Sequence, residues 1–142
     1  MLTDLLKKAL ADVFAFYLKT QFYHWNVEGS DFYQYHELFG EIYEEVQGSV
    51  DMLAEQIRTL NEYAPGSLSR FKELTSITED TTIPNSTTMA KNLLVENSKV
   101  IMSITAAYKQ AEEDGNLGVS NFLQDRLTAH RKHEWFLRAS TK

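Results

Sequence analysis

Four side chains in this sequence have the types and spacing of a metal site: His24, His36, Asp51 and Glu55. Asp51 and Glu55 are four residues apart, so on a helix their carboxylates share one face and repel each other. A bound cation would offset this repulsion, and the alternative is an ordinary solvated acidic face. Each histidine taken alone is more often a packed or surface residue than a ligand. Together, the imidazoles and carboxylates form the mixed ligand set that suits iron.

The distance along the chain restricts how these groups can meet. Asp51 follows His36 on what reads as one helix, and their separation amounts to about 22 Å of helical rise. The two residues therefore cannot bind one ion within one chain, although both can point to roughly the same side. A second subunit packed antiparallel about a two-fold axis could place its Asp51 and Glu55 beside the first subunit's His24 and His36. The spacing thus favours a site shared between subunits.

A di-iron site inside a single bundle is disfavoured. Such bundles carry Glu-x-x-His motifs on their helices. The residues three positions before the four histidines are Gln21, Tyr33, Leu127 and His130, so the motif is absent. His130 and His133 form an i, i+3 pair beside Glu134, and a packed or surface role is favoured over metal binding for them.

The elements that must position these groups follow from the hydrophobic period. Apolar residues recur at helical spacing in four long segments, about 3–27, 32–61, 87–114 and 117–139. Thr3 is expected to cap the first segment, and Ser30 or Asp31 the second. The second segment is predicted as one continuous helix.

Turn-forming residues separate these segments. Gly29 lies between the first two, and Gly115 and Gly118 between the last two. The connection over 62–86 is long, and a short helix is expected at 67–73, followed by a Thr/Ser-rich loop. Helix pair, long crossover and helix pair together predict an all-α, ferritin-like four-helix bundle that forms one domain over residues 1–142.

The composition narrows the function classes. The 142 residues carry a formal net charge of -6, which disfavours DNA binding by the surface as a whole and suits cations. The sequence has no cysteine, which excludes disulfides and thiol nucleophiles. No apolar run approaches the roughly 20 residues of a membrane span. With an N-terminus that lacks a signal-peptide core, these features predict a cytoplasmic protein.

Several motifs together resemble one family. The segment Tyr23-His24-Trp25-Asn26-Val27-Glu28-Gly29 is followed by His36-Glu37 and by Asp51-Met52-Leu53-Ala54-Glu55, and the chain ends with His133-Glu134-Trp135-Phe136-Leu137. These motifs are similar in type and spacing to those of the Dps family (DNA-binding proteins from starved cells, the bacterial mini-ferritins). The resemblance covers essentially the whole chain.

The resemblance implies a twelve-subunit shell with ferroxidase sites at the dimer interfaces, each built from His24 and His36 of one chain and Asp51 and Glu55 of another. It implies that Fe(II) is oxidised, often by hydrogen peroxide, and stored as ferric mineral, which protects against oxidative damage. It also implies a role for Trp25 in absorbing stray oxidising equivalents, for which simple interface packing is the alternative.

The sequence departs from the family pattern at three places. Gly40 stands where the family commonly has an aspartate, so that carboxylate of the second iron position is missing. Glu37, Glu41 or Glu44 could replace it, although adjacent helix positions such as 40 and 41 point about 100° apart. Helix one begins within a few residues of Met1 and contains Lys7 and Lys8, so the Lys-rich DNA-binding tail of several members is not expected. Asn121 stands at a position that matches a pore aspartate. The acids that could replace it at the pore, or simply form a solvated face, are Asp125, Glu112, Glu113 and Asp114.

The leading hypothesis is therefore an iron-storing, iron-detoxifying ferroxidase. The alternative from another class is a nucleoid-associated protein that condenses DNA and binds iron incidentally. A third possibility is a cage that Gly40 has left inactive. Aerobic or peroxide-driven Fe(II) oxidation separates the first from the third, and DNA retention in a gel separates the first from the second.

Overall fold

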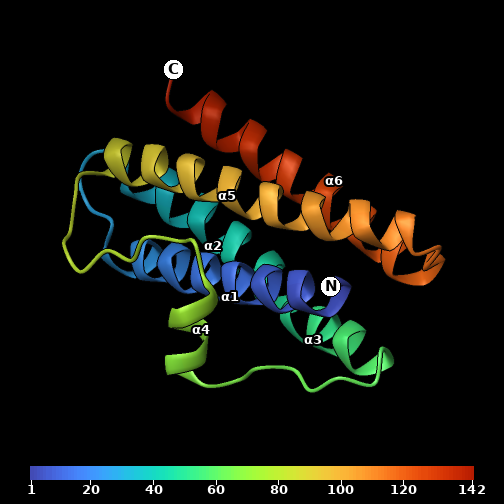
Figure 1. Ribbon diagram of the computed structural model, residues 1–142. Coiled ribbons are helices and arrows are strands. Elements are labelled where there is room, and N and C mark those ends of the chain that lie inside the picture. The colour runs from blue at the N-terminus through green and yellow to red at the C-terminus, as the bar shows by residue number, and fades with distance from the viewer.

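The computed structural model describes all 142 residues and contains helices and connecting loops only. Its six helices are α1 (Leu2–Asn26), α2 (Phe32–Gly48), α3 (Val50–Thr59), α4 (Leu68–Leu74), α5 (Ser86–Glu113) and α6 (Leu117–Ser140). α1, α2, α5 and α6 form a four-helix bundle, and α3 continues from α2 toward the far end (Figure 1). The expected all-α, ferritin-like bundle is confirmed.

The long connection changes the direction in which the second helix pair runs. It leaves the end of α3, carries α4 beside α1, and reaches the opposite end of the bundle before α5 begins (Figure 1). As a result α5 runs parallel to α2, as expected for a bundle with a crossover between its helix pairs. None of the helices is long and apolar enough to cross a membrane.

The core is continuous along the bundle because each long helix has one apolar stripe. Its fully buried side chains include Leu6, Leu10 and Phe16 of α1, Phe39 and Ile42 of α2, Leu93 and Ile104 of α5, and Leu123 of α6. Burying a side chain of this size stabilises the fold by about 1.5–3 kcal/mol before the cost of ordering it. The apolar stripes of α1 and α2 also determine which faces of these two helices lie outside the core.

Two expectations about the helices were wrong. The second segment is not continuous, because the hydroxyl and the backbone N–H of Ser49 both donate to the carbonyl of Val46, at 2.6 and 3.0 Å. These bonds to the residue three positions earlier tighten the chain and separate α2 from α3. Thr3 does not cap α1, because the helix starts one residue earlier and Met1 takes the cap position.

Other boundaries are close to those expected. Asp31 holds the N-cap position of α2 without a side-chain hydrogen bond. The short crossover helix is α4, and Ser67 caps it by accepting a hydrogen bond from the Arg70 N–H at 3.2 Å. The Thr/Ser-rich stretch is a loop up to Asn85, which caps α5 through its side chain.

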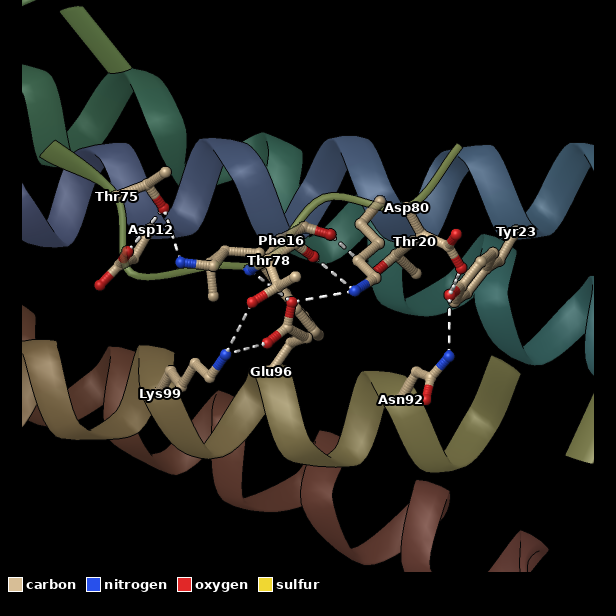
Figure 2. A network of polar contacts seen from close by, with 12 residues as sticks. Asp12, Phe16, Thr20, Tyr23, Thr75, Thr78, Asp80, Asn92, Glu96 and Lys99 are labelled. Carbon is tan, nitrogen blue, oxygen red and sulfur yellow. Dashed lines mark hydrogen bonds and ion pairs between the residues drawn. The ribbon is translucent and has the colours of Figure 1, made fainter. Parts of the chain in front are cut away.

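Buried polar side chains hold the crossover loop to the bundle (Figure 2). Asp12 of α1 accepts hydrogen bonds from the Thr75 hydroxyl at 2.7 Å and from the Ser76 N–H at 2.6 Å. Glu96 of α5 accepts from the Thr78 N–H at 2.8 Å and pairs with Lys19 of α1 at 2.9 Å. Because Asp12 and Glu96 are buried, these bonds satisfy charges that would otherwise be costly to remove from water.

The same loop also anchors the end of α1. The Tyr23 hydroxyl donates to Asp80 at 2.6 Å and accepts from the Asn92 amide at 3.1 Å (Figure 2). Burial, followed by the hydrogen bond to Asp80, raises the pKa of Tyr23, and the hydrogen bonds from Thr82 and Tyr23 lower the pKa of Asp80 to about 2. Tyr23 precedes His24 in the chain, so this contact fixes the turn of helix that carries the first candidate ligand.

Candidate metal centre

His24 and His36 lie side by side where α1 ends and α2 begins. His24 is in the last turn of α1, and His36 is in the second turn of α2. Gly29 allows the chain to reverse between them with a φ of 114°, a conformation that a residue with a side chain rarely adopts. The two imidazole rings are stacked, with centroids 3.9 Å apart and planes 16° apart.

Two reciprocal hydrogen bonds fix the orientation of both rings. The Nδ1–H of His24 donates to the carbonyl oxygen of His36 at 2.7 Å, and the Nδ1–H of His36 donates to the carbonyl oxygen of His24 at 2.8 Å. A carbonyl oxygen can only accept, so each Nδ1 must carry its proton. In the neutral rings, each Nε2 then keeps its lone pair, which is the arrangement that a metal-binding histidine needs.

Small and aromatic neighbours shape the space around the two rings. A Cβ atom added to Gly40 would lie 3.0 Å from Cε1 and 3.1 Å from Nδ1 of His24, so the missing side chain makes room for this ring. Phe32 stacks on His36 with ring centroids 5.0 Å apart, and Tyr43 lies against His24 with centroids 5.1 Å apart. The pair is thus held by its backbone bonds and by contacts on its sides.

Asp51 and Glu55 lie on α3, away from the histidines. Both are exposed and, being four residues apart on one helix, share a face. The α1–α2 turn and α3 lie at opposite ends of the bundle (Figure 1). Within one chain, no group of three or more His, Asp or Glu side chains is placed to hold a metal ion. The structure brings the histidines together and the carboxylates together, but it does not bring the two pairs together in one chain.

Trp25 follows His24 but points elsewhere. Its side chain is 62% exposed, and its ring contacts neither histidine ring. This exposure leaves Trp25 free to pack against another molecule, and its role in taking up oxidising equivalents stays a prediction.

His130 and His133 belong to a closed polar network in the bundle core. His130 is completely buried, with Nδ1 2.8 Å from the Asn97 side-chain oxygen and Nε2 3.0 Å from an Arg126 nitrogen. Nε2 of His133 lies 2.7 Å from a Glu45 oxygen, and Arg126 binds both Glu45 oxygens at 2.5 and 3.0 Å. The packed role expected for these histidines is confirmed.

The charged groups in this network shift one another's pKa values. Burial alone would raise the pKa of Glu45, but the hydrogen bonds from His133 and Arg126 outweigh it and hold that pKa well below its ordinary value. Burial, followed by the charge of Arg126, holds the pKa of His130 well below 6.5, so His130 stays neutral. The Nε–H of Arg126 is the one buried side-chain polar atom left without a partner.

The remaining candidates lie on the surface. Asn121, Asp125, Glu112, Glu113 and Asp114 are all exposed near the α5–α6 turn. Glu112 accepts a hydrogen bond from the Ser120 hydroxyl at 2.5 Å. Lys7 and Lys8 lie within α1 as expected, and Lys8 is 3.6 Å from Asp12.

Comparison with known proteins identifies the family. The ferritin-like domain family model matches residues 3–142. A DNA protection during starvation protein of Helicobacter pylori is 31% identical over 137 residues, which are 96% of this chain and 95% of that protein. The crystal structure of a Dps protein from Vibrio cholerae O1, described as a member of a broad superfamily of ferritin-like diiron-carboxylate proteins, matches with a TM-score of 0.95. It is 31% identical and covers 99% of this chain and 89% of that one. This chain belongs to the Dps family of ferritin-like proteins.

Two further matches cover nearly all of this chain. An uncharacterized low temperature-induced protein of Nostoc sp. is 32% identical over 138 residues, 96% of this chain and 77% of that protein. The structure of Helicobacter cinaedi CAIP is 27% identical with a TM-score of 0.93, and each chain is covered completely.

Within the Dps pattern, the structure adds residues that the sequence alone did not single out. Tyr43 packs on His24, and Gly40 lies close to the same ring. Glu45, Asn97 and Arg126 form the core network. A signal for the network was present, since Asn97 and His130 fall at gaps in the apolar stripes of their helices.

Proposed function

We propose that this Dps-family protein oxidises Fe(II) at sites shared between two subunits and stores the product as ferric mineral inside a hollow cage. The observation that carries the proposal is the locked histidine pair. Both Nδ1 protons are used in backbone hydrogen bonds, and both Nε2 atoms are left without a partner in the chain. Two preoriented imidazoles supply half of an iron ligand set.

The other half of the proposed site comes from a partner subunit. Asp51 and Glu55 are exposed on α3 and add the carboxylate oxygens that Fe(II) and Fe(III) favour. A two-fold axis that places α3 of one subunit beside the α1–α2 turn of another generates two identical sites at once. The proposed assembly is a homododecamer, in which such dimers close into a shell.

The proposed reaction is the oxidation of Fe(II) by hydrogen peroxide or oxygen, followed by deposition of the ferric product. His24, His36, Asp51 and Glu55 bind the iron, which is substrate and cargo. Consuming Fe(II) and peroxide together removes the reactants that form hydroxyl radicals, and this is the proposed protective role.

The experiment is to follow Fe(II) oxidation optically in the wild type, in Asp51→Ala and in Asp4→Ala. Asp4 is an exposed acid in the first turn of α1, so its removal is the matched control. We expect Asp51→Ala to lose most of the rate and Asp4→Ala to keep it. Equal rates for wild type and Asp51→Ala would refute the site. A stable monomer by mass measurement would refute the shared arrangement.

DNA condensation is the alternative, and the charge distribution does not favour it. The formal net charge is -6, and the two lysines near the N-terminus, Lys7 and Lys8, lie inside α1 close to Glu62 and Asp12. We expect no DNA retention in a gel at physiological salt, where phosphate contacts are weakened. Strong retention would favour the alternative.

A further inference from the structure

The polar network in the bundle core is built around one cation, the guanidinium of Arg126. Its Nη1 lies 2.5 Å from one oxygen of Glu45, and its Nη2 lies 3.0 Å from the other oxygen and 3.0 Å from Nε2 of His130. Nε2 of His133 lies 2.7 Å from the same Glu45 oxygen that Nη2 contacts. One carboxylate and two imidazoles thus meet where the Arg126 side chain ends.

These three groups are a ligand set for a divalent transition metal. Two histidines and one carboxylate, with the remaining positions open, form a common set for Fe(II). His130 and His133 are three residues apart on α6, the same spacing as in the Glu-x-x-His motif, and Glu45 meets them from α2. Di-iron bundles build their metal sites in this way, from side chains that project into the core from different helices.

His130 is already oriented as a metal ligand. The side-chain amide nitrogen of Asn97 donates to the backbone carbonyl of His130 at 2.9 Å, so the amide oxygen faces Nδ1 of the ring at 2.8 Å. Nδ1 therefore carries the proton, and Nε2 keeps its lone pair, which accepts from Arg126. A hydrogen bond that holds Nδ1–H in this way is typical of histidines that bind metals through Nε2.

Burial makes a positive charge necessary at this position. His130 is completely buried, and Arg126 and His133 are nearly so. A carboxylate that meets such buried groups is costly unless a cation is paired with it. The Nε–H of Arg126 has no partner, so the polar contacts of this side chain come from its two terminal nitrogens. The terminal nitrogens hold the place at which a metal ion would neutralise Glu45.

We propose that the guanidinium of Arg126 occupies a metal-binding position in the bundle core, and that a divalent transition metal binds Glu45, His130 and His133 when this guanidinium is removed. In the wild type, where no three such side chains are placed to hold a metal ion, Arg126 keeps iron out of the core. Metal–ligand bonds of about 2.0–2.2 Å require the ligands to close in by about 1 Å. The proton that His133 donates to Glu45 leaves Nε2 when the metal binds.

The test uses Co(II) as the probe, because its visible absorption reports the number and type of its ligands. His24→Ala/His36→Ala first removes the imidazoles of the α1–α2 turn. Arg126→Met is then added, since a methionine side chain follows the arginine stem about as far as Nε and lacks the guanidinium. No hydrogen bond is lost at Nε itself. Arg131→Met, at an exposed arginine of the same helix, is the matched control.

With Arg126→Met, the assembled protein is expected to bind one Co(II) per subunit with the intense absorption of a four- or five-coordinate ion. Its melting temperature should rise with the Co(II) concentration, because the metal binds only the folded chain. Adding His133→Phe or Glu45→Gln removes one ligand and should abolish both changes. The background protein and its Arg131→Met derivative should show neither, since exposed carboxylates hold six-coordinate Co(II), which absorbs weakly.

Three results would overturn the inference. They are a folded Arg126→Met protein without this absorption, absorption that persists after His133→Phe and Glu45→Gln, and the same absorption in the background protein, where Arg126 would then exclude nothing. If Arg126→Met does not fold alone, circular dichroism with and without Co(II) decides. Folding restored by Co(II) supports the site, and a chain that stays unfolded with Co(II) contradicts it. Iron oxidation plays no part in these measurements, so a failure here leaves the proposed ferroxidase function untouched.

Discussion

Two histidine pairs in this molecule differ in what their ring nitrogens contact. In the pair at the α1–α2 turn, His24 and His36 use Nδ1 for backbone carbonyls and leave Nε2 free. In the core pair, His130 uses both ring nitrogens, and Nε2 of His133 is held by Glu45. The residue type is the same, but only in the first pair are both Nε2 atoms without a partner in the chain.

The comparison shows that partners, and not the histidines themselves, separate a binding site from a structural network. Arg126 brings a permanent positive charge within 3.0 Å of Nε2 of His130, which excludes a cation from that position. At the α1–α2 turn, the absence of a side chain at Gly40 makes room for the His24 ring instead. The core pair should therefore affect stability, and the turn pair should affect activity.

Replacing one histidine of each pair gives the largest expected effects. His24→Ala should reduce Fe(II) oxidation by more than the roughly 10- to 100-fold typical of residues that only support a ligand. Its effect on stability should be small because His24 is only partly buried. His130→Ala should instead lower the free energy of unfolding by about 2–4 kcal/mol, because it leaves Asn97 and Arg126 without a buried partner. Denaturant titration and oxidation rates measured on both variants test this, and loss of stability in His24→Ala alone would contradict it.

Acid should weaken the core pair through Glu45. The folded-state pKa of Glu45 is depressed, so its contribution is complete above its ordinary pKa of 4.5 and is lost as the pH falls toward the folded value. His130 acts in the same direction below 6.5, because the unfolded chain takes up a proton that the folded chain does not.

Glu45→Gln tests the first of these contributions. This variant should lower the free energy of unfolding by about 2 kcal/mol at neutral pH, a value discounted because the Glu45 side chain is 39% exposed. Its stability should then fall less steeply in acid than that of the wild type. The melting temperature measured across this pH range is the readout. An equally steep acid loss in wild type and Glu45→Gln would show that Glu45 is not responsible.

Adding one methyl group at Gly40 should perturb only the turn pair. The new Cβ would lie 3.0 Å from Cε1 of His24, so the ring must shift by a few tenths of an ångström. We expect Gly40→Ala to weaken Fe(II) binding by about tenfold, because ligand geometry is sensitive to such shifts. Stability should change little, since alanine gains about 1 kcal/mol of helix propensity against the strain. Calorimetry of Gly40→Ala, with the exposed Gly48→Ala as control, measures the Fe(II) affinity by titration and the stability by thermal unfolding.

The smallest effect is expected at the contact between Tyr23 and the crossover loop. Tyr23→Phe removes the hydrogen bonds to Asp80 and Asn92 and should cost about 1 kcal/mol of unfolding free energy. Hydrogen exchange should increase first in the loop at residues 75–85. An equal loss of stability in Tyr108→Phe, which lacks these partners, would mean that the loop contact is not the cause.

The apolar stripes and turn residues predicted most of the fold because both signals are local. Four long helices and the short Ser67-capped helix follow from periodicity, glycine and serine positions. The break at Ser49 could not be read in this way, because it depends on side-chain and backbone bonds to Val46 that a periodic pattern does not encode.

The proposed site was only partly visible in the sequence. The types and spacing of His24, His36, Asp51 and Glu55 could be recognised, together with the distance that separates the two pairs. The tautomer of each histidine, the contact of Tyr43 with His24 and the closeness of Gly40 could not, since they depend on how α1 packs on α2. Packing between helices is a long-range property that one sequence does not specify locally.

The most direct test of the shared site mixes two inactive variants. His24→Ala keeps both carboxylates, and Asp51→Ala keeps both histidines. A dimer of the two variants therefore contains one complete site, with the histidines of the second variant and the carboxylates of the first. Its other site lacks both His24 and Asp51. With random pairing, about a quarter of all sites are then complete. After the two variants are unfolded and reassembled together, a shared site predicts about that fraction of the wild-type Fe(II) oxidation rate. A mixture as inactive as its separate components would contradict it.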